Sequence, residues 1–243
     1  MTKAEIRKNI GAVIVFFLIA IGCRYATNET GLLAHIDNDF FRIVIQGVGP
    51  AVAALVVFKV FRIKPQMTLT GGYRNKWIPL LIFWVLPVVA IVAFAYLTTA
   101  KWSFFILPIL IYALLEEIGW RGFLQPALSF LPKFTGILIV TVLWFVWHLN
   151  FAFDNSSLIF FAVLLLGSWG MAAISRKTNS VLAVSAFHAA YDIYASVEKP
   201  SVYFMVILAA IFLIWLLAVI FYDQLNKKLD NAKSVDATLL ELL

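Results

Sequence analysis

The stretch that decides the fold reads Leu114-Leu115-Glu116-Glu117-Ile118-Gly119-Trp120-Arg121-Gly122-Phe123-Leu124. It places two carboxylates and one guanidinium within six residues of a chain that is otherwise mostly apolar. An ionised side chain at the centre of a bilayer costs about 2.5–3.5 kcal/mol. The three groups therefore need polar partners, and buried groups of this kind indicate a functional site.

The composition of the whole chain indicates a membrane protein. Of 243 residues, 63% are hydrophobic and 13% are charged, whereas soluble domains have about 45–50% and 25%. A soluble core of this size cannot hide so much apolar surface, so lipid must solvate part of it. The net charge of +6 is explained by the basic loops of membrane proteins and does not indicate a nucleic-acid partner.

Eight apolar runs approach the roughly 20 residues that cross a bilayer. They cover residues 9–27, 41–61, 77–99, 102–125, 135–152, 157–175, 180–196 and 202–222. Because the loops are short and no repeat is visible, the runs predict an all-α fold. The fold is one integral membrane bundle over residues 1–243 with about eight transmembrane helices.

The first run contains the only cysteine, Cys23, which excludes an internal disulfide and a cysteine-rich metal site. The string Ala20-Ile21-Gly22-Cys23 weakly resembles a lipoprotein cleavage box but lacks the usual leucine. We therefore interpret residues 9–27 as an uncleaved membrane span.

Basic residues predict the orientation of the bundle. With eight crossings and a cytoplasmic N-terminus, four of the 19 basic residues are outside, namely Arg24, Arg42, Lys101 and Lys199. The other 15 are inside: Lys3, Arg7, Lys8, Lys59, Arg62, Lys64, Arg74, Lys76, Arg121, Lys133, Arg176, Lys177, Lys227, Lys228 and Lys233. This bias follows the positive-inside rule and places both termini in the cytoplasm. The basic segment 62–76 is expected to contact anionic lipid head groups rather than to recruit substrate.

Helical spacing separates the two adjacent glutamates of the central stretch. Glu117 and Arg121 are four residues apart on one helix face, with the acid first, which is the favourable order for an ion pair. Glu116 is rotated by about 100° from that face. Glu117 and Arg121 are therefore expected to support the site structurally, and Glu116 is available for general base chemistry.

Three further polar residues occur in later apolar runs. His148 ends the string Trp144-Phe145-Val146-Trp147-His148, and His188 precedes Asp192 by four residues, which places these two on one face. Residue type alone permits two chemistries. Glu116 and the histidines could activate water for attack on a carbonyl, or Glu116, His148, His188 and Asp192 could ligate a divalent metal.

These motifs together resemble the CAAX protease and bacteriocin-processing family of intramembrane endopeptidases. The resemblance rests on Glu116-Glu117-x-x-x-Arg121-Gly122, on an aromatic residue at Trp144 followed by His148, and on His188-x-x-x-Asp192, and it covers roughly residues 100–196. It implies an eight-helix fold in a cell membrane and metal-independent, glutamate-dependent hydrolysis of a peptide or protein substrate. It also implies that Glu116 acts with His148 as the base, and that His188 and the residue at 192 line the oxyanion site.

Two positions depart from the family pattern. Trp144 stands where Phe is commonest, a mild change because an aromatic ring still packs. Asp192 stands where the eukaryote-like enzymes have Asn. An ionised Asp would repel an oxyanion, so Asp192 must be protonated, orient His188 or ligate a metal.

Three other functions are compatible with the same residues. A non-enzymatic adaptor or immunity protein could keep the fold, and a metal-dependent protease or an ion-coupled transporter could use the same buried acids and histidines. Discontinuous helices in two paired halves would favour the transporter, and the sequence shows no such repeat. In a host without prenylation, the expected substrate is a secreted peptide, a bacteriocin or a signalling precursor.

Overall fold

The computed structural model describes residues 1–243 except 102, 151, 153 and 227–243. The described chain is all-α, as predicted, and its one β-type contact is an isolated bridge between Thr68 and Ser180. Lys227, Lys228 and Lys233, which the sequence analysis places on the cytoplasmic side, lie outside the described residues.

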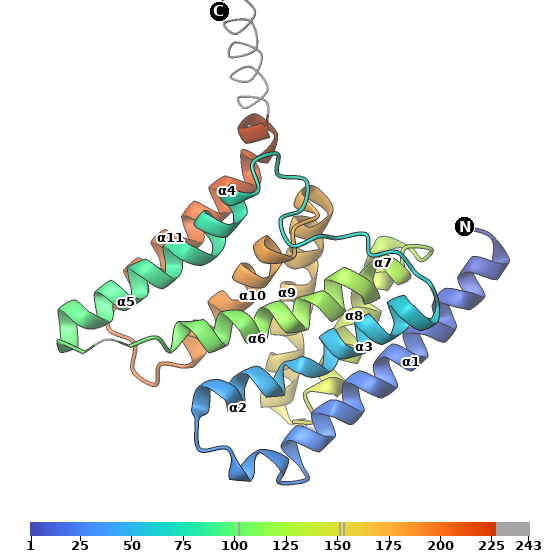
Figure 1. The fold of residues 1–243 in the computed structure, drawn as a ribbon, viewed down its shortest axis with the longest axis horizontal. Coiled ribbons are helices and arrows are strands. Elements are labelled where there is room, and N and C mark those ends of the chain that lie inside the picture. Colours follow the sequence, from blue (N-terminus) through green and yellow to red (C-terminus); the bar gives the residue numbers. More distant parts are fainter. Residues whose placement is uncertain (102, 151, 153, 227–243) are drawn as a thin grey trace, which may run out of the picture.

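Each of the eight apolar runs contains helix (Figure 1). In chain order, the helices are α1 (Lys3–Asn28), η1 (Leu32–His35), α2 (Asp39–Gln46), α3 (Val48–Val60), α4 (Trp77–Leu80), η2 (Leu81–Val85), α5 (Leu86–Thr99), α6 (Ile106–Gly119), η3 (Trp120–Leu124), α7 (Gln125–Ala127), α8 (Lys133–Trp147), α9 (Asn155–Thr178), α10 (Val181–Ala195) and α11 (Val202–Ile220). The turns η2 and η3 are π-helical and lie inside longer continuous helices.

Four helical segments are long and apolar enough to cross a membrane: α1, Trp77–Thr99, α9 and α11. The pair α2–α3 makes a fifth candidate if the two helices, bent by 42°, form one span. The protein is therefore a multi-pass membrane protein, and the predicted number of eight crossings stays a prediction.

The helix α6 occupies the middle of the bundle. It packs against α3 on one side and α10 on the other, and α3 in turn packs against α1 (Figure 1). Two hydrophobic clusters meet where α6 continues into η3, because Ala113 of α6 belongs to one cluster and Trp120 of η3 belongs to the other. The residues between these positions include Glu116 and Glu117, so both acids lie where the clusters join.

A close approach between α3 and α6 fixes their packing. A Cβ atom added at Gly119 would lie 2.5 Å from Pro50 Cβ and 2.7 Å from the Pro50 carbonyl oxygen. Only glycine fits at this crossing, because real Cβ atoms do not approach other atoms so closely.

The connections between helices gather at two ends of the bundle. At one end, Lys8 Nζ donates to the Arg62 carbonyl, and Asn9 Nδ2 donates to the Ala127 carbonyl. The bridge of Thr68 to Ser180 joins the same region. We call this the basic end; it comprises the start of α1 and the connections 61–76, 128–132 and 179–180. The ends of α1, α5, α8 and α10 and the starts of α2, α6, α9 and α11 form the opposite end (Figure 1).

One residue counted among the cytoplasmic basic residues does not belong to that end. Arg121 is fully buried, and its Nη1 lies 2.7 Å from Glu117 Oε1. A neutralised, buried guanidinium adds no charge to a loop, so Arg121 must be removed from the orientation argument.

Candidate active site

Glu117 lies at the centre of the buried polar cluster. Its Oε1 accepts hydrogen bonds from Arg121 Nη1 at 2.7 Å and from His188 Nδ1 at 2.8 Å. Arg121 also donates to Ser168 Oγ at 3.1 Å, and its guanidinium lies 4.5 Å from the centre of the Trp144 ring. The expected pair of Glu117 and Arg121 is present, and it also fixes the imidazole of His188.

Glu116 has different partners from its neighbour. Its Oε2 accepts the indole N–H groups of Trp120 at 3.0 Å and Trp144 at 2.7 Å. Its Oε1 is buried and has no hydrogen-bond partner among the described residues. The two tryptophans therefore hold one oxygen in place and leave the other available for a proton.

His148 lies at the C-terminal cap of α8 rather than inside the helix, which was expected to continue to residue 152. The helix ends because Leu149 adopts φ +55°, in the left-handed region. His148 Nδ1 lies 2.7 Å from the Trp144 carbonyl oxygen. Since a carbonyl only accepts, Nδ1 carries the proton, and Nε2 of the neutral ring is a free acceptor.

His188 and Asp192 form the third part of the cluster. His188 Nε2 lies 3.5 Å from Asp192 Oδ2, while its Nδ1 faces Glu117. Asp192 is 27% exposed, whereas the side chain of Glu117 is fully buried. This contact favours the orientation of His188 as the role of Asp192.

The π-helical turn η3 positions the acids and Arg121 together. It follows Gly119 directly, contains Trp120 and Arg121, and closes with the Gln125 N–H bonded to the Trp120 carbonyl. Such turns insert one extra residue into a helix and are frequent at functional sites.

An apolar cavity of about 260 Å³ opens between α8, α9 and α10 beside the cluster. The residues His148, His188, Asp192 and Trp144 line it, and its other walls include Phe160, Leu166 and Phe212. Glu116 and Glu117 lie behind these residues, fully buried. The histidines are therefore the groups that a molecule in the cavity would touch first.

A second, polar cavity of about 420 Å³ reaches His148 at the opposite end of the bundle. Its lining includes Arg24, Thr27, Gln46 and Asn150. The guanidinium of Arg24 lies 4.5 Å from the centre of the Trp147 ring. His148 thus stands between an apolar and a polar cavity.

The sequence did not identify four residues that contact the cluster or its cavities. Trp120 binds Glu116, Ser168 binds Arg121, Arg24 lines the polar cavity, and the Tyr112 ring centre lies 6.5 Å from that of His188. The spacing of four residues between Tyr112 and Glu116, and between Glu116 and Trp120, was a usable signal. No such signal exists for Ser168, which is a common residue type distant along the chain.

The described residues contain no group of three or more His, Cys, Asp or Glu side chains placed to hold a metal ion. Glu117, His188 and Asp192 approach one another in a line, with the imidazole between the two carboxylates. The acids thus face the ring nitrogens and not a common central point.

The fold and site define a class: a multi-pass helical membrane protein with a buried Glu, Arg and His cluster beside an apolar cavity. Residues 95–194 match the family model described as type II CAAX prenyl endopeptidase Rce1-like, so this part of the chain is a domain of that family. The match confirms the resemblance and nearly coincides with the predicted residues 100–196. Neither the curated proteins nor the solved structures that were compared give a match.

Proposed function

We propose that this protein is an intramembrane endopeptidase that hydrolyses a peptide bond of a membrane-associated protein or peptide. One observation carries the proposal. His148 and His188, from two different helices, line one apolar cavity and are backed by two buried glutamates within a CAAX endopeptidase family domain. The substrate enters this cavity with its scissile bond facing the two histidines.

In the proposed reaction, a water molecule attacks the carbonyl carbon of the scissile bond. Nε2 of His148 accepts one proton of that water, with Glu116 Oε1 as the second acceptor of the pair. A carbon–oxygen bond forms, and the carbonyl oxygen becomes an oxyanion. Transfer of the proton to the leaving nitrogen then breaks the carbon–nitrogen bond and releases an amine and a carboxylic acid.

His188 is the proposed donor to the developing oxyanion. Its Nδ1 lies 2.8 Å from Glu117 Oε1 and holds the ring, while its Nε2 makes only the longer 3.5 Å contact with Asp192 Oδ2. The N–H at Nε2 is therefore the group that donates to the oxyanion, in place of its contact with Asp192. In this assignment Glu117 and Asp192 orient the ring, and Arg121 neutralises Glu117. Trp144 is a positioning residue, because its indole holds Glu116 and its carbonyl holds His148.

Water reaches the site through the polar cavity in this scheme. The walls of the apolar cavity include Phe160 and Phe212, which favour an apolar or extended peptide over water. The polar cavity also reaches His148 and shares Phe160 with the apolar cavity. In this scheme substrate and water approach His148 through two different cavities.

The proposal is tested by peptidomics of cells that carry the wild-type protein, Glu116→Gln or His148→Ala. Each substitution should lower processing by roughly 100- to 10,000-fold, the usual contribution of a general base. Exposed Glu198→Gln and His35→Ala are matched controls that should keep full processing. The peptides that disappear name the substrate, and a secreted or bacteriocin-like precursor is the proposed kind.

Full processing by both site variants, in protein that is folded in the membrane, would overturn the assignment. A cellular function that persists in Glu116→Gln without any peptidase activity would indicate a non-enzymatic adaptor or immunity protein. Chelator treatment of the purified protein should leave activity unchanged, whereas a loss restored by added zinc would indicate a metal-dependent protease.

A further inference from the structure

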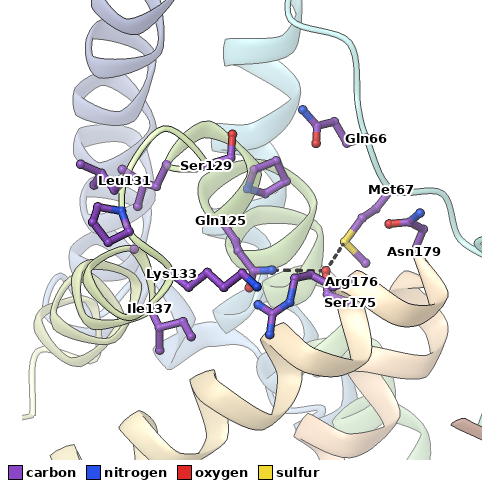
Figure 2. A pocket seen from close by; sticks show the side chains of 14 residues that line it. Gln66, Met67, Gln125, Ser129, Leu131, Lys133, Ile137, Ser175, Arg176 and Asn179 are labelled. Atoms are coloured by element: carbon purple, nitrogen blue, oxygen red, sulfur yellow. Dashed lines mark hydrogen bonds between the residues drawn. The ribbon is translucent and has the colours of Figure 1, made fainter. Parts of the chain in front are cut away.

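A cavity of about 270 Å³ lies at the basic end of the bundle, at the other end of α8 from His148 (Figure 2). It opens between the connection from α7 to α8 and the last turn of α9. Lys133 and Arg176 reach into it from these two helices, as Figure 2 shows. The proposed protease chemistry uses none of the residues that line it.

The charge of this cavity is positive and unbalanced. No acidic residue of the described chain lines it. Within the described residues, the side chain of neither Lys133 nor Arg176 takes part in a hydrogen bond or an ion pair. Two cations that share a cavity repel each other, so an anion between them lowers the free energy of the site.

Weakly engaged polar groups line the inner part of the same cavity. The buried hydroxyl of Ser175 donates to Met67 Sδ at 3.1 Å, and a thioether sulfur is a weak acceptor. Gln125 Nε2 lies 3.4 Å from Ser175 Oγ, a long hydrogen bond (Figure 2). Gln66 and Asn179 add amide groups at the rim. These donors can turn toward an anion at little cost.

We infer that this cavity binds a phosphate-bearing anion between Lys133 and Arg176. An arginine fork and a lysine ammonium are the side chains that recognise phosphate oxygens. The headgroup of an anionic phospholipid is the source that the surroundings favour. Leu131, Pro132 and Ile137 give the cavity apolar lining, and Phe134, next to Lys133 in α8, is 64% exposed and free to contact acyl chains.

The test measures lipid binding by the full-length protein. Purified protein is reconstituted in phosphatidylcholine vesicles with and without phosphatidylglycerol, and retained lipid is counted by native mass spectrometry. Wild type should retain phosphatidylglycerol over phosphatidylcholine. Lys133→Gln and Arg176→Gln should each weaken retention about fivefold, and the double variant about 25-fold, because each basic group contributes a similar gain at an anionic surface.

Matched controls separate this site from general charge. Lys101→Gln and Lys199→Gln remove exposed cations from the opposite end and should leave retention unchanged. The charge-conserving pair Lys133→Arg and Arg176→Lys should retain most of the binding. Thermal unfolding in detergent should be the same for all variants, since Lys133 and Arg176 are exposed.

A second arm adds inorganic phosphate to the vesicles. Displacement of the lipid only at phosphate concentrations far above that of the lipid supports a headgroup site. Displacement at equal concentrations supports the anion site with free phosphate as its ligand. The inference is overturned if wild type shows no preference for phosphatidylglycerol, or if the control variants lose as much lipid as the double variant.

Discussion

Glu117 accepts hydrogen bonds from two side chains that can carry a positive charge, Arg121 and His188. A single oxygen, Oε1, accepts from Arg121 and from His188, and all three groups are buried. Two charges removed from water are stable only when geometry and additional hydrogen bonds compensate for the lost hydration. Arg121 obtains this compensation from Glu117, from Ser168 and from the face of Trp144.

Removal of Arg121 alone should therefore be costly. We expect Arg121→Met to lower the free energy of unfolding by about 3–5 kcal/mol, because Glu117 loses a close cation. The double variant Arg121→Met with Glu117→Gln should recover part of this loss. Thermal unfolding in detergent measures both, and equal stability of wild type and Arg121→Met would contradict a structural role for the pair.

Helical spacing predicted those contacts of the site that join residues four positions apart. The pairs of Glu117 with Arg121 and of His188 with Asp192 are four residues apart, and both contacts are present. The contact of His188 with Glu117 joins residues 71 positions apart, so it depends on how α6 and α10 pack. Apolar patterns do not determine such a register, and for the same reason Ser168 was not identified.

At the scale of the helices, the apolar runs predicted the positions of the helices better than their ends and bends. The second run is interrupted at Gly47, which separates α2 from α3. The run that begins at 77 contains Pro79 and Pro87, and a π-helical turn lies between them. A proline lacks the N–H that continues an α-helix, so the local backbone adjusts in a way that hydropathy cannot indicate.

The crossing of α3 and α6 depends on one glycine. Gly119→Ala should destabilise the protein by about 1–3 kcal/mol, because the new methyl group would meet the Pro50 backbone and ring at under 3 Å. Gly22→Ala in α1 is the control. Apart from the neighbouring backbone of its own helix, no atom lies within 4 Å of its new Cβ, so the better helix propensity of alanine should stabilise the protein by about 0.5–1 kcal/mol.

Thermal unfolding of both variants in the same detergent tests this crossing. Because Gly119 lies two residues from Glu117, Gly119→Ala should also lower peptidase activity more than stability alone accounts for. Unchanged stability of Gly119→Ala would show that α3 can shift at no cost, and the close packing would then not be what positions the acids.

At the scale of the whole molecule, alternate connections lie at the same end of the bundle, and this is the arrangement that eight crossings require. Exposed lysines illustrate the charge difference between the ends: Lys3, Lys8, Lys64, Lys76 and Lys133 lie at the basic end, and Lys101 and Lys199 lie at the other. The short α8 and α10 pack against other helices in the interior of the bundle. A helix of 15 residues can cross such a region if the bilayer thins or flanking residues extend toward water.

Labelling of single cysteines in intact cells tests the number of crossings and their orientation. In a Cys23→Ser background, a cysteine replaces one exposed residue at a time, and a membrane-impermeant thiol reagent is added outside. Eight crossings with cytoplasmic termini predict protection at Lys3, Lys64, Lys133 and Lys177 until the cells are opened. They predict direct labelling at Asp37, Lys101, Asn155 and Lys199. The reverse pattern would keep eight crossings but invert the positive-inside orientation. Labelling that divides either group between the two sides would contradict eight crossings, and the position where the pattern changes would identify the helix that does not span.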